Sequence, residues 1–204
     1  MKKILILFAH PRYESSRANQ ALIAGISSLE GVTIHDLYER YPDFNVDVRY
    51  EKELLMHHDI IIWQHPFYWY SCPPLLKQWI DMVLEFGWAY GSGGDALEGK
   101  QVFNALTTGG KREVYCKDGR NHYTIREFLR PFEQTARLCR MEYLPPFALM
   151  GTHRLEEVAL EREVRAYRRL LQSLSRDSVE IPKGDNCQFL NDLPNLQTER
   201  DDEW

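Results

Sequence analysis

Three short stretches of the sequence hold side chains that suit a phosphorylated ligand with a flat ring. Hydroxyl and basic side chains gather in the first, residues 10–19, which reads His-Pro-Arg-Tyr-Glu-Ser-Ser-Arg-Ala-Asn. The second, residues 65–72, reads His-Pro-Phe-Tyr-Trp-Tyr-Ser-Cys and is dense in aromatic rings. The third, residues 107–110, is Thr-Thr-Gly-Gly. Each stretch follows an apolar run, so each is expected at the end of a strand.

The first stretch suits a phosphate group. Ser16 and Arg17 stand where a helix is predicted to begin, and the first turn of a helix presents free N–H groups and a positive dipole end. Serine is also a frequent N-cap residue, so a purely structural role for Ser15 or Ser16 is the alternative. Both interpretations remain open from the sequence.

The second and third stretches suit a planar heterocycle. The rings from Phe67 to Tyr70 can pack beside a flat ligand, or they can form an aromatic plug between loops or an interface in an oligomer. The stretch from Thr107 to Gly110 combines two hydroxyls with two glycines that let the backbone approach a ligand closely. A four-residue motif is weak evidence by itself, and it supports a ligand site here because it is expected at the same edge of the sheet as the other two stretches.

Several familiar site motifs are absent from the sequence. It holds no GxxxxGK[ST] phosphate loop, no GxGxxG dinucleotide fingerprint and no GxSxG nucleophile elbow. His57 and His58 are adjacent, and neighbours on a helix point about 100° apart, so we expect them to be structural. No metal site is predicted.

Apolar runs alternate with segments of helical periodicity, which is typical of βαβ units. The runs are continuous rather than alternating, as in parallel strands covered on both faces. The predicted strands are residues 3–9, 32–37, 59–64, 101–108 and 142–150, the last shortened by Pro145-Pro146. The predicted helices are residues 17–29, 51–57, 73–84, 123–139, with a kink or start at Pro131, and 160–174, while residues 38–50 are expected to form an ordered loop.

This pattern predicts an α/β fold of three layers, a flavodoxin-like, doubly wound arrangement with a five-stranded parallel sheet. In such sheets, ligands bind beyond the carboxyl ends of the strands. The three polar and aromatic stretches follow the first, third and fourth predicted strands, so we expect them to lie on the same rim.

Composition limits the kinds of protein this chain can be. Its 204 residues are 44% hydrophobic, which predicts one domain or one with an appendage. The net charge of −5 argues against a nucleic-acid partner. The longest apolar run, residues 4–9, is far shorter than the roughly 20 residues of a membrane-spanning helix. Four scattered cysteines are expected to be reduced thiols, and a cytoplasmic location is predicted.

The excess of negative charge lies at the C-terminal end. Residues 176–204 hold three basic and eight acidic side chains, whereas residues 1–175 are balanced. The sequence therefore predicts a folded domain over residues 1–175 and an acidic tail over residues 176–204, which serves as a solubilising extension or a docking segment. Deletion of the tail is expected to leave the activity intact.

Taken together, the three stretches resemble the NAD(P)H:quinone oxidoreductase family, and within it the ancillary flavoproteins of glutathione-gated potassium efflux systems. The segment Pro-Pro-Leu-Leu-Lys-Gln-Trp at residues 73–79 supports the resemblance. So do Asp36-Leu37-Tyr38, Tyr41-Pro42-Asp43-Phe44 and Leu144-Pro145-Pro146-Phe147. The resemblance spans about residues 3–174.

The resemblance implies a homodimer that binds FMN, or FAD as in larger diaphorase relatives. It implies that the phosphate and ribityl chain lie against His10, Ser16, Arg17, Ala18 and Asn19, the isoalloxazine against Phe67, Tyr68, Trp69 and Tyr70, and its pyrimidine edge against Thr107, Thr108, Gly109 and Gly110. Tyr115 matches a catalytic tyrosine of the family. His122 stands one residue away from the family's catalytic histidine, and the alternative is an exposed loop residue.

The implied activity is two-electron hydride transfer from NAD(P)H, through flavin N5, to a quinone or related electrophile. Trp88 and Tyr90 match aromatic residues that separate the substrate site from the dimer partner, and Lys111 and Arg112 are candidates for contact with a dinucleotide phosphate. The alternatives are a regulatory ancillary subunit of a potassium efflux transporter, held peripherally at the inner membrane through that partner, and a flavodoxin-type electron carrier.

Overall fold

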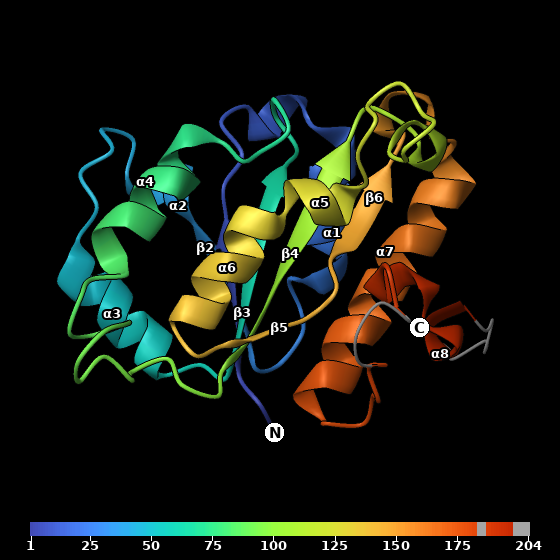
Figure 1. The fold of residues 1–204 in the computed structure, drawn as a ribbon. Coiled ribbons are helices and arrows are strands. Elements are labelled where there is room, and N and C mark those ends of the chain that lie inside the picture. The colour runs from blue at the N-terminus through green and yellow to red at the C-terminus, as the bar shows by residue number, and fades with distance from the viewer. Residues whose placement is uncertain (183–186, 198–204) are drawn as a thin grey trace.

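A parallel β-sheet forms the centre of the protein, whose computed structural model describes residues 1–182 and 187–197 (Figure 1). Every residue of the strands β1 (Ile4–Phe8) and β3 (Ile60–Pro66) is buried, as is nearly all of β4 (Gln101–Thr108). Continuous apolar runs form these strands because helices cover both faces of a parallel sheet.

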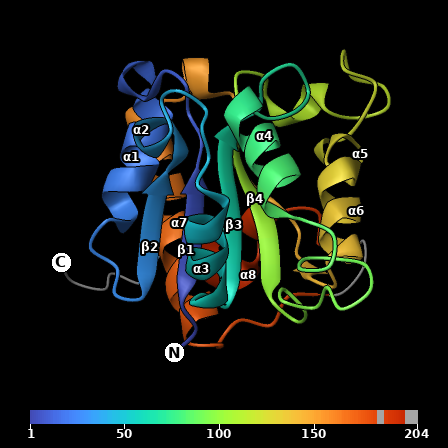
Figure 2. The ribbon, with the colours of Figure 1, turned by 90° about the vertical axis from the view of Figure 1, so that its left-hand side faces the viewer.

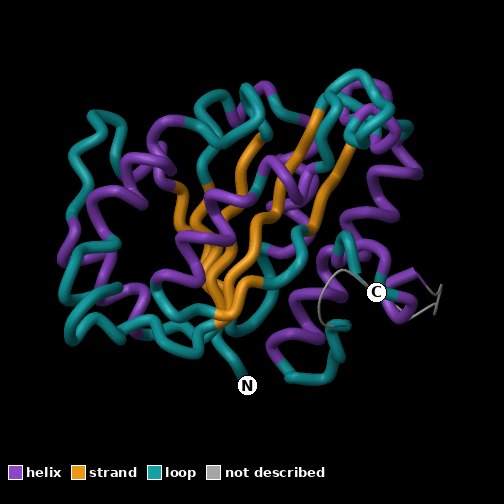
Figure 3. The backbone as a smooth tube through the Cα atoms, viewed as in Figure 1, coloured by secondary structure: helices purple, strands orange, loops and turns teal. Residues whose placement is uncertain are grey.

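The strand order is β2-β1-β3-β4, with β2 (Val32–Asp36) at one edge (Figure 3). At the other edge β5 (Glu142–Tyr143) and β6 (Phe147–Met150) both pair with β4, and all pairs are parallel. The predicted flavodoxin-like fold is confirmed. The single strand predicted over residues 142–150 is wrong, because prolines 145 and 146 lack N–H groups and interrupt the ladder.

Helices cover both faces of the sheet, so the fold has three layers (Figure 2). One face, bearing Ile4, Ile6 and Ile62, packs against two helices, and the opposite face, bearing Leu5 and Trp63, packs against three. The first pair is α1 (Arg17–Ile26) and α7 (Glu157–Ser175), and the second set is α3 (Val48–Met56), α4 (Pro74–Val83) and α6 (Arg130–Leu138).

Two local predictions need correction. Part of the predicted loop over residues 38–50 is the short helix α2 (Leu37–Arg40), because the Asp36 carboxylate accepts hydrogen bonds from the N–H groups at its start. The helix predicted over residues 123–139 is divided into α5 (Ile125–Phe128) and α6. Pro131 lies in the first turn of α6, where a missing N–H costs nothing.

The C-terminal segment, residues 187–197, is folded onto the sheet and α7. It contains a short 3₁₀ turn (Leu190–Asp192) and the helix α8 (Pro194–Gln197), and the Leu190 N–H donates to the Pro146 carbonyl at 2.9 Å. Its apolar side chains are buried: Phe189, Leu190, Leu193 and Leu196. The predicted acidic tail is corrected for this stretch, since burial of these side chains holds it against the domain. Residues 183–186 and 198–204 of the predicted tail lie outside the described residues.

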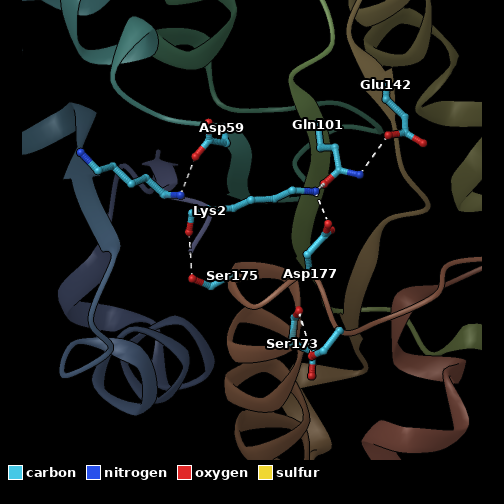
Figure 4. Close-up of polar contacts among 9 residues, drawn as sticks. Lys2, Asp59, Gln101, Glu142, Ser173, Ser175 and Asp177 are labelled. Atoms are coloured by element: carbon cyan, nitrogen blue, oxygen red, sulfur yellow. Dashed lines mark hydrogen bonds and ion pairs between the residues drawn. The ribbon is translucent and has the colours of Figure 1, made fainter.

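A polar network closes the amino end of the sheet (Figure 4). The Lys2 ammonium donates to Gln101 Oε1 at 3.2 Å and to Asp177 Oδ1 at 2.7 Å. The Ser175 hydroxyl donates to the Lys2 carbonyl, and the Gln101 amide donates to Glu142. These contacts fix the end of α7 to β4 and β5, and they lie at the opposite end of the sheet from the three stretches of interest.

Within the described residues, no helix combines the length and apolar character needed to cross a bilayer.

Candidate functional site

A cavity of about 890 Å³ opens at the carboxyl ends of the strands, where the loops after β1, β3, β4 and β6 meet. All three stretches singled out in the sequence contribute to its walls. The lining residues are His10, Arg12, Ser15, Ser16, Arg17, Ala18, Pro66, Phe67, Tyr68, Thr107, Gly109, Thr152, His153, Arg154 and Leu155. The three stretches therefore share one concave surface, and the binding of a cofactor there stays a prediction.

The start of α1 forms a cationic end of this cavity. Ser16 is the N-cap residue, and its hydroxyl accepts a hydrogen bond from the Asn19 N–H. Since the first turn of a helix leaves its other N–H groups without partners in the helix, they are available to an anion. Arg17 bonds Glu157 at 3.0 Å and the Leu155 carbonyl, while Arg12 and Arg154 have no carboxylate partner among the described residues.

Asn19 joins the first and third stretches. Its amide nitrogen donates to Ser16 Oγ at 2.9 Å and to Thr107 Oγ1 at 3.1 Å. Asn19 is buried, and its Oδ1 has no hydrogen-bond partner among the described residues. Asn19 itself is not among the residues that line the cavity, so its part is to hold Ser16 and Thr107, which do line it.

His10 lies at the end of β1 and is buried. Its Nδ1 accepts a hydrogen bond from the Arg12 N–H at 3.1 Å, which shapes the loop before α1. Burial lowers the pKa of His10 below its ordinary value, so the ring is neutral at pH 7 and can accept this bond.

The aromatic stretch after β3 divides into two parts. Phe67 and Tyr68 line the cavity. Trp69 is 93% exposed, and the Tyr70 ring stacks on Phe128 with the centroids 5.0 Å apart. Trp69 and Tyr70 both have positive φ, at 48° and 63°, so the chain turns sharply here. This turn places the second pair of rings outside the cavity.

The Thr-Thr-Gly-Gly stretch lies at the end of β4. Thr107 and Gly109 line the cavity, whereas the Thr108 hydroxyl donates to the Gly110 carbonyl at 2.6 Å. A Cβ atom on Gly109 would lie 2.6 Å from Nε2 of His153. The missing Cβ at Gly109 therefore leaves room for the exposed His153 side chain, which follows β6.

Comparison with known proteins agrees with this arrangement. A family model described as a flavodoxin-like fold matches residues 2–171. The chain belongs to this family. It is 47% identical over 171 residues to the glutathione-regulated potassium-efflux system ancillary protein KefG of Pectobacterium carotovorum, a match that covers 84% of this chain and 93% of the relative.

Two solved structures of this flavodoxin-like family illustrate the likeness in three dimensions. General stress protein 14 of Treponema denticola, in complex with FMN, is 40% identical with a TM-score of 0.79, covering 84% of this chain and 99% of that one. An NADPH-quinone reductase from P. pentosaceus is 36% identical with a TM-score of 0.76, covering 82% and 96%.

The two residues predicted to be catalytic occupy different positions in this flavodoxin-like chain. The Tyr115 ring lies 5.9 Å from the Phe67 ring, at the edge of the cavity, and burial raises the pKa of its hydroxyl above the ordinary value. His122 is exposed in a turn with φ of 61°, and it is not among the residues that line the cavity. Its catalytic role stays a prediction.

The loop after β6 is the part of the site that the sequence analysis missed. Thr152, His153 and Arg154 line the cavity opposite the start of α1. They follow a strand at the same edge of the sheet as the other loops, and this position was the available signal. Arg12 and Ser15 of the first stretch also line the cavity, although neither is among the predicted cofactor-binding residues.

Proposed function

We propose that the chain is an FMN-dependent NAD(P)H:quinone oxidoreductase. The observation that carries the proposal is the 890 Å³ cavity, which joins a cationic helix start to an aromatic wall and a glycine-containing strand end. The FMN complex of the 40% identical Treponema protein and the 36% identical quinone reductase support it. The substrate would be a quinone or a related electrophile.

The residues present fit FMN. The phosphate would bind at the start of α1, near Arg12, Arg17 and Arg154, where N–H groups and cations converge. The flat ring would lie against Phe67 and Tyr68, with its polar edge at Thr107 and Gly109. Behind this wall, the Asn19 amide donates to Ser16 and Thr107 and holds these two lining residues in place. Bound flavin supplies an acceptor for hydride from NAD(P)H and a donor of two electrons to the second substrate.

The side chains of the protein would position the substrates and stabilise the charge that develops during hydride transfer. The Tyr115 hydroxyl is protonated at pH 7, as in any tyrosine, and burial raises its pKa further, so it would serve as a hydrogen-bond donor beside the ring site. Such a preoriented donor stabilises negative charge that develops during hydride transfer. Backbone N–H groups of the strand end after Thr107 play the same part at the polar edge of the ring.

A second copy of the chain would complete the site as a homodimer. Large aromatic side chains remain exposed, including Trp69 at 93% in the loop after β3 and Phe86 at 70% in the segment after α4. Aromatic residues are enriched at protein interfaces, so exposed rings of this size favour burial against a partner chain. Trp88 and Tyr90 follow Phe86 in the same loop and would separate the substrate site from the partner.

A second candidate function is that of an ancillary subunit of a potassium efflux system. The 47% identity to KefG over most of both chains favours it. In that role the protein would be cytoplasmic and would reach the inner membrane through the transporter. The two functions are compatible, since a reductase can report the redox state to a partner. Transport assays with flavin-site variants would separate them, because a purely regulatory role survives loss of reductase activity.

Release and identification of the cofactor tests the proposal. The purified chain is expected to be yellow, and heat denaturation is expected to release FMN rather than FAD. Thr107→Val, which removes the acceptor for Asn19, is expected to weaken FMN binding about tenfold, whereas Thr107→Ser retains the hydroxyl and the affinity. A colourless protein that takes up no added FMN would refute the proposal.

A further inference from the structure

A second cavity, of about 540 Å³, lies on the other side of Tyr115 from the flavin site proposed above. The loop after β4 and the start of α5 and α6 form two of its walls, and the C-terminal segment forms the third. The lining residues are Arg112, Tyr115, Cys116, Lys117, Thr124, Arg126, Glu127, Arg130, Gln188 and Phe189. The third wall lies beyond residues 2–171, which the family model matches.

The C-terminal wall is held firmly in place. Arg112 forms two hydrogen bonds to the Asp192 carboxylate, each 2.7 Å long. The Arg112 guanidinium also lies 4.6 Å from the centre of the Phe189 ring, and Arg126 Nη1 donates to the Cys187 carbonyl at 3.0 Å. Phe189 is only 6% exposed. The cavity is therefore a fixed feature of the fold.

The cavity carries an excess of positive charge. Four of its lining side chains are cationic and one, Glu127, is anionic. Asp192 pairs with Arg112 and Glu133 with Arg130, and Glu127 accepts hydrogen bonds from the N–H and hydroxyl of Thr124. Within residues 1–182 and 187–197, Lys117 and Arg126 have no carboxylate within ion-pair distance. Two uncompensated cations on one cavity favour an anionic ligand.

The position of the cavity narrows the choice of anion. Tyr115 lines it, and the Tyr115 ring lies 5.9 Å from Phe67, which lines the first cavity. A ligand that reaches both cavities must carry a ring at one end and phosphate at the other. A nicotinamide dinucleotide has this form, and the Phe189 ring offers a flat apolar contact for a base.

We propose that the second cavity binds the adenosine end of NADPH, with Lys117 and Arg126 contacting its 2′-phosphate. The proposal rests on the reductase function and deepens it, because NADH lacks that phosphate and would bind more weakly. Loss of one charged contact is expected to lower the affinity about tenfold. Arg112, a sequence candidate for this contact, instead holds the wall through Asp192.

Direct binding of adenosine 2′,5′-bisphosphate tests the proposal without any turnover. Calorimetric titration of the purified full-length chain is expected to show tighter binding of this probe than of AMP. Lys117→Gln and Arg126→Gln are each expected to weaken the bisphosphate about tenfold and to leave AMP nearly unchanged. Because Lys117 forms no hydrogen bond or ion pair with the described residues, its variant keeps the test independent of folding. Arg49→Gln, at a 90% exposed side chain on α3, is the matched control.

Two results would overturn the proposal: equal binding of the bisphosphate and AMP, or unchanged bisphosphate affinity in Lys117→Gln. Its failure is distinguishable from failure of the reductase function. A chain that oxidises NADH and NADPH equally well, yet binds no bisphosphate, would retain the function and lose this site. A chain that binds the bisphosphate through Lys117 but reduces no quinone would retain the anion site and lose the reductase function.

Discussion

The Arg112 guanidinium and the Asp192 carboxylate form a two-bonded ion pair between positions 80 residues apart, with both donor–acceptor distances 2.7 Å. This pair fixes the C-terminal segment to the loop after β4. Both side chains are more than one third exposed, so solvent limits the contribution of the pair to stability to about 1 kcal/mol. Its main effect is geometric, since it holds Phe189 over the loop that contains Tyr115.

Truncation after Ile181 is expected to destabilise the protein. It removes the buried side chains of Phe189, Leu190, Leu193 and Leu196. Each such side chain contributes about 1.5–3 kcal/mol when buried, so the free energy of unfolding is expected to fall by about 5 kcal/mol or more. Urea unfolding monitored by circular dichroism measures the change.

A chain ending at Gln197 is the control for this truncation, since it keeps all four buried side chains. It is expected to unfold at nearly the urea concentration of the full chain. Equal stability of the shorter truncation and the full chain would show that residues 187–197 are a dispensable tail, as the composition alone suggests.

Protonation of His65 is expected to weaken the fold in mild acid. His65 Nδ1 donates to the Pro66 carbonyl at 3.0 Å, and Asn104 Nδ2 donates to its Nε2 at 3.0 Å. Burial lowers the pKa of His65 to about 4, against 6.5 for an exposed ring. Between pH 6.5 and 4 the unfolded chain therefore binds a proton at His65 that the folded chain does not bind. The free energy of unfolding is highest above pH 6.5, and it is expected to fall by about 3 kcal/mol as the pH drops toward 4.

Urea unfolding from pH 4 to pH 8 tests this prediction. His65→Gln is expected to be less stable than the wild type at pH 7, because it disturbs both hydrogen bonds, and to lose less stability on acidification. The difference between the two curves isolates His65 from His10 and His58, whose pKa values burial also lowers. Parallel curves would contradict the assignment.

Gly109→Ala is expected to weaken FMN binding about tenfold. A Cβ at this position would lie 2.6 Å from the His153 ring, and glycine is the only residue without one. The His153 ring must move to make room for the methyl group, and both residues line the cavity. Fluorescence titration with FMN measures the loss.

A second substitution makes the test specific. In the double variant Gly109→Ala with His153→Ala, the ring that meets the new methyl group is gone, so part of the affinity is expected to return. A double-mutant cycle then gives a coupling between the two positions. Additive losses would mean that the glycine is needed for another reason.

Much of the fold follows from the sequence for a simple physical reason. The runs at residues 4–8 and 60–63 are apolar on both faces, as expected of a buried parallel strand. The packing of the C-terminal segment was not predicted, because it depends on tertiary contacts. The few apolar side chains of residues 187–197 are separated by polar residues in the sequence, so they show no clear pattern. They become buried only by packing against β6 and α7.

In the site, too, residues placed by the ends of strands were predicted, whereas those placed by loop conformation were not. Residues that follow a strong strand, such as His10 and Thr107, were found because the strand ends place them. Trp69 and Tyr70 were assigned to the ring site by their chemistry, but the left-handed turn that directs them away from the cavity has no clear signal in aromatic residues. The residues after β6 were missed although a strand was predicted to end at residue 150, because binding residues were expected only after the first, third and fourth strands.

Trp69→Asn is expected to weaken a homodimer. Trp69 is 93% exposed beside the cavity, and loss of a large aromatic contact at an interface costs about 2 kcal/mol or more. Asparagine tolerates the positive φ of this position, so the turn is preserved. Sedimentation measured across a range of protein concentrations is expected to show dissociation at higher concentration than in the wild type.

Val158→Asn is the control for this variant, because Val158 is an exposed apolar side chain near the start of α7 rather than in the aromatic loop. It is expected to leave the association unchanged. A wild-type chain that stays monomeric at every concentration, or a Trp69→Asn variant that associates as tightly, would contradict the proposed dimer.

Anaerobic reduction of the FMN-loaded chain is the direct test of the proposed quinone reductase activity. Mixing with NADPH is expected to bleach the visible absorbance of the flavin, and a soluble quinone added afterwards is expected to restore it, with NADPH and quinone consumed in equal amounts. The account would be contradicted if FMN is bound and its absorbance is unchanged by NADPH, or if the reduced protein passes no electrons to any quinone.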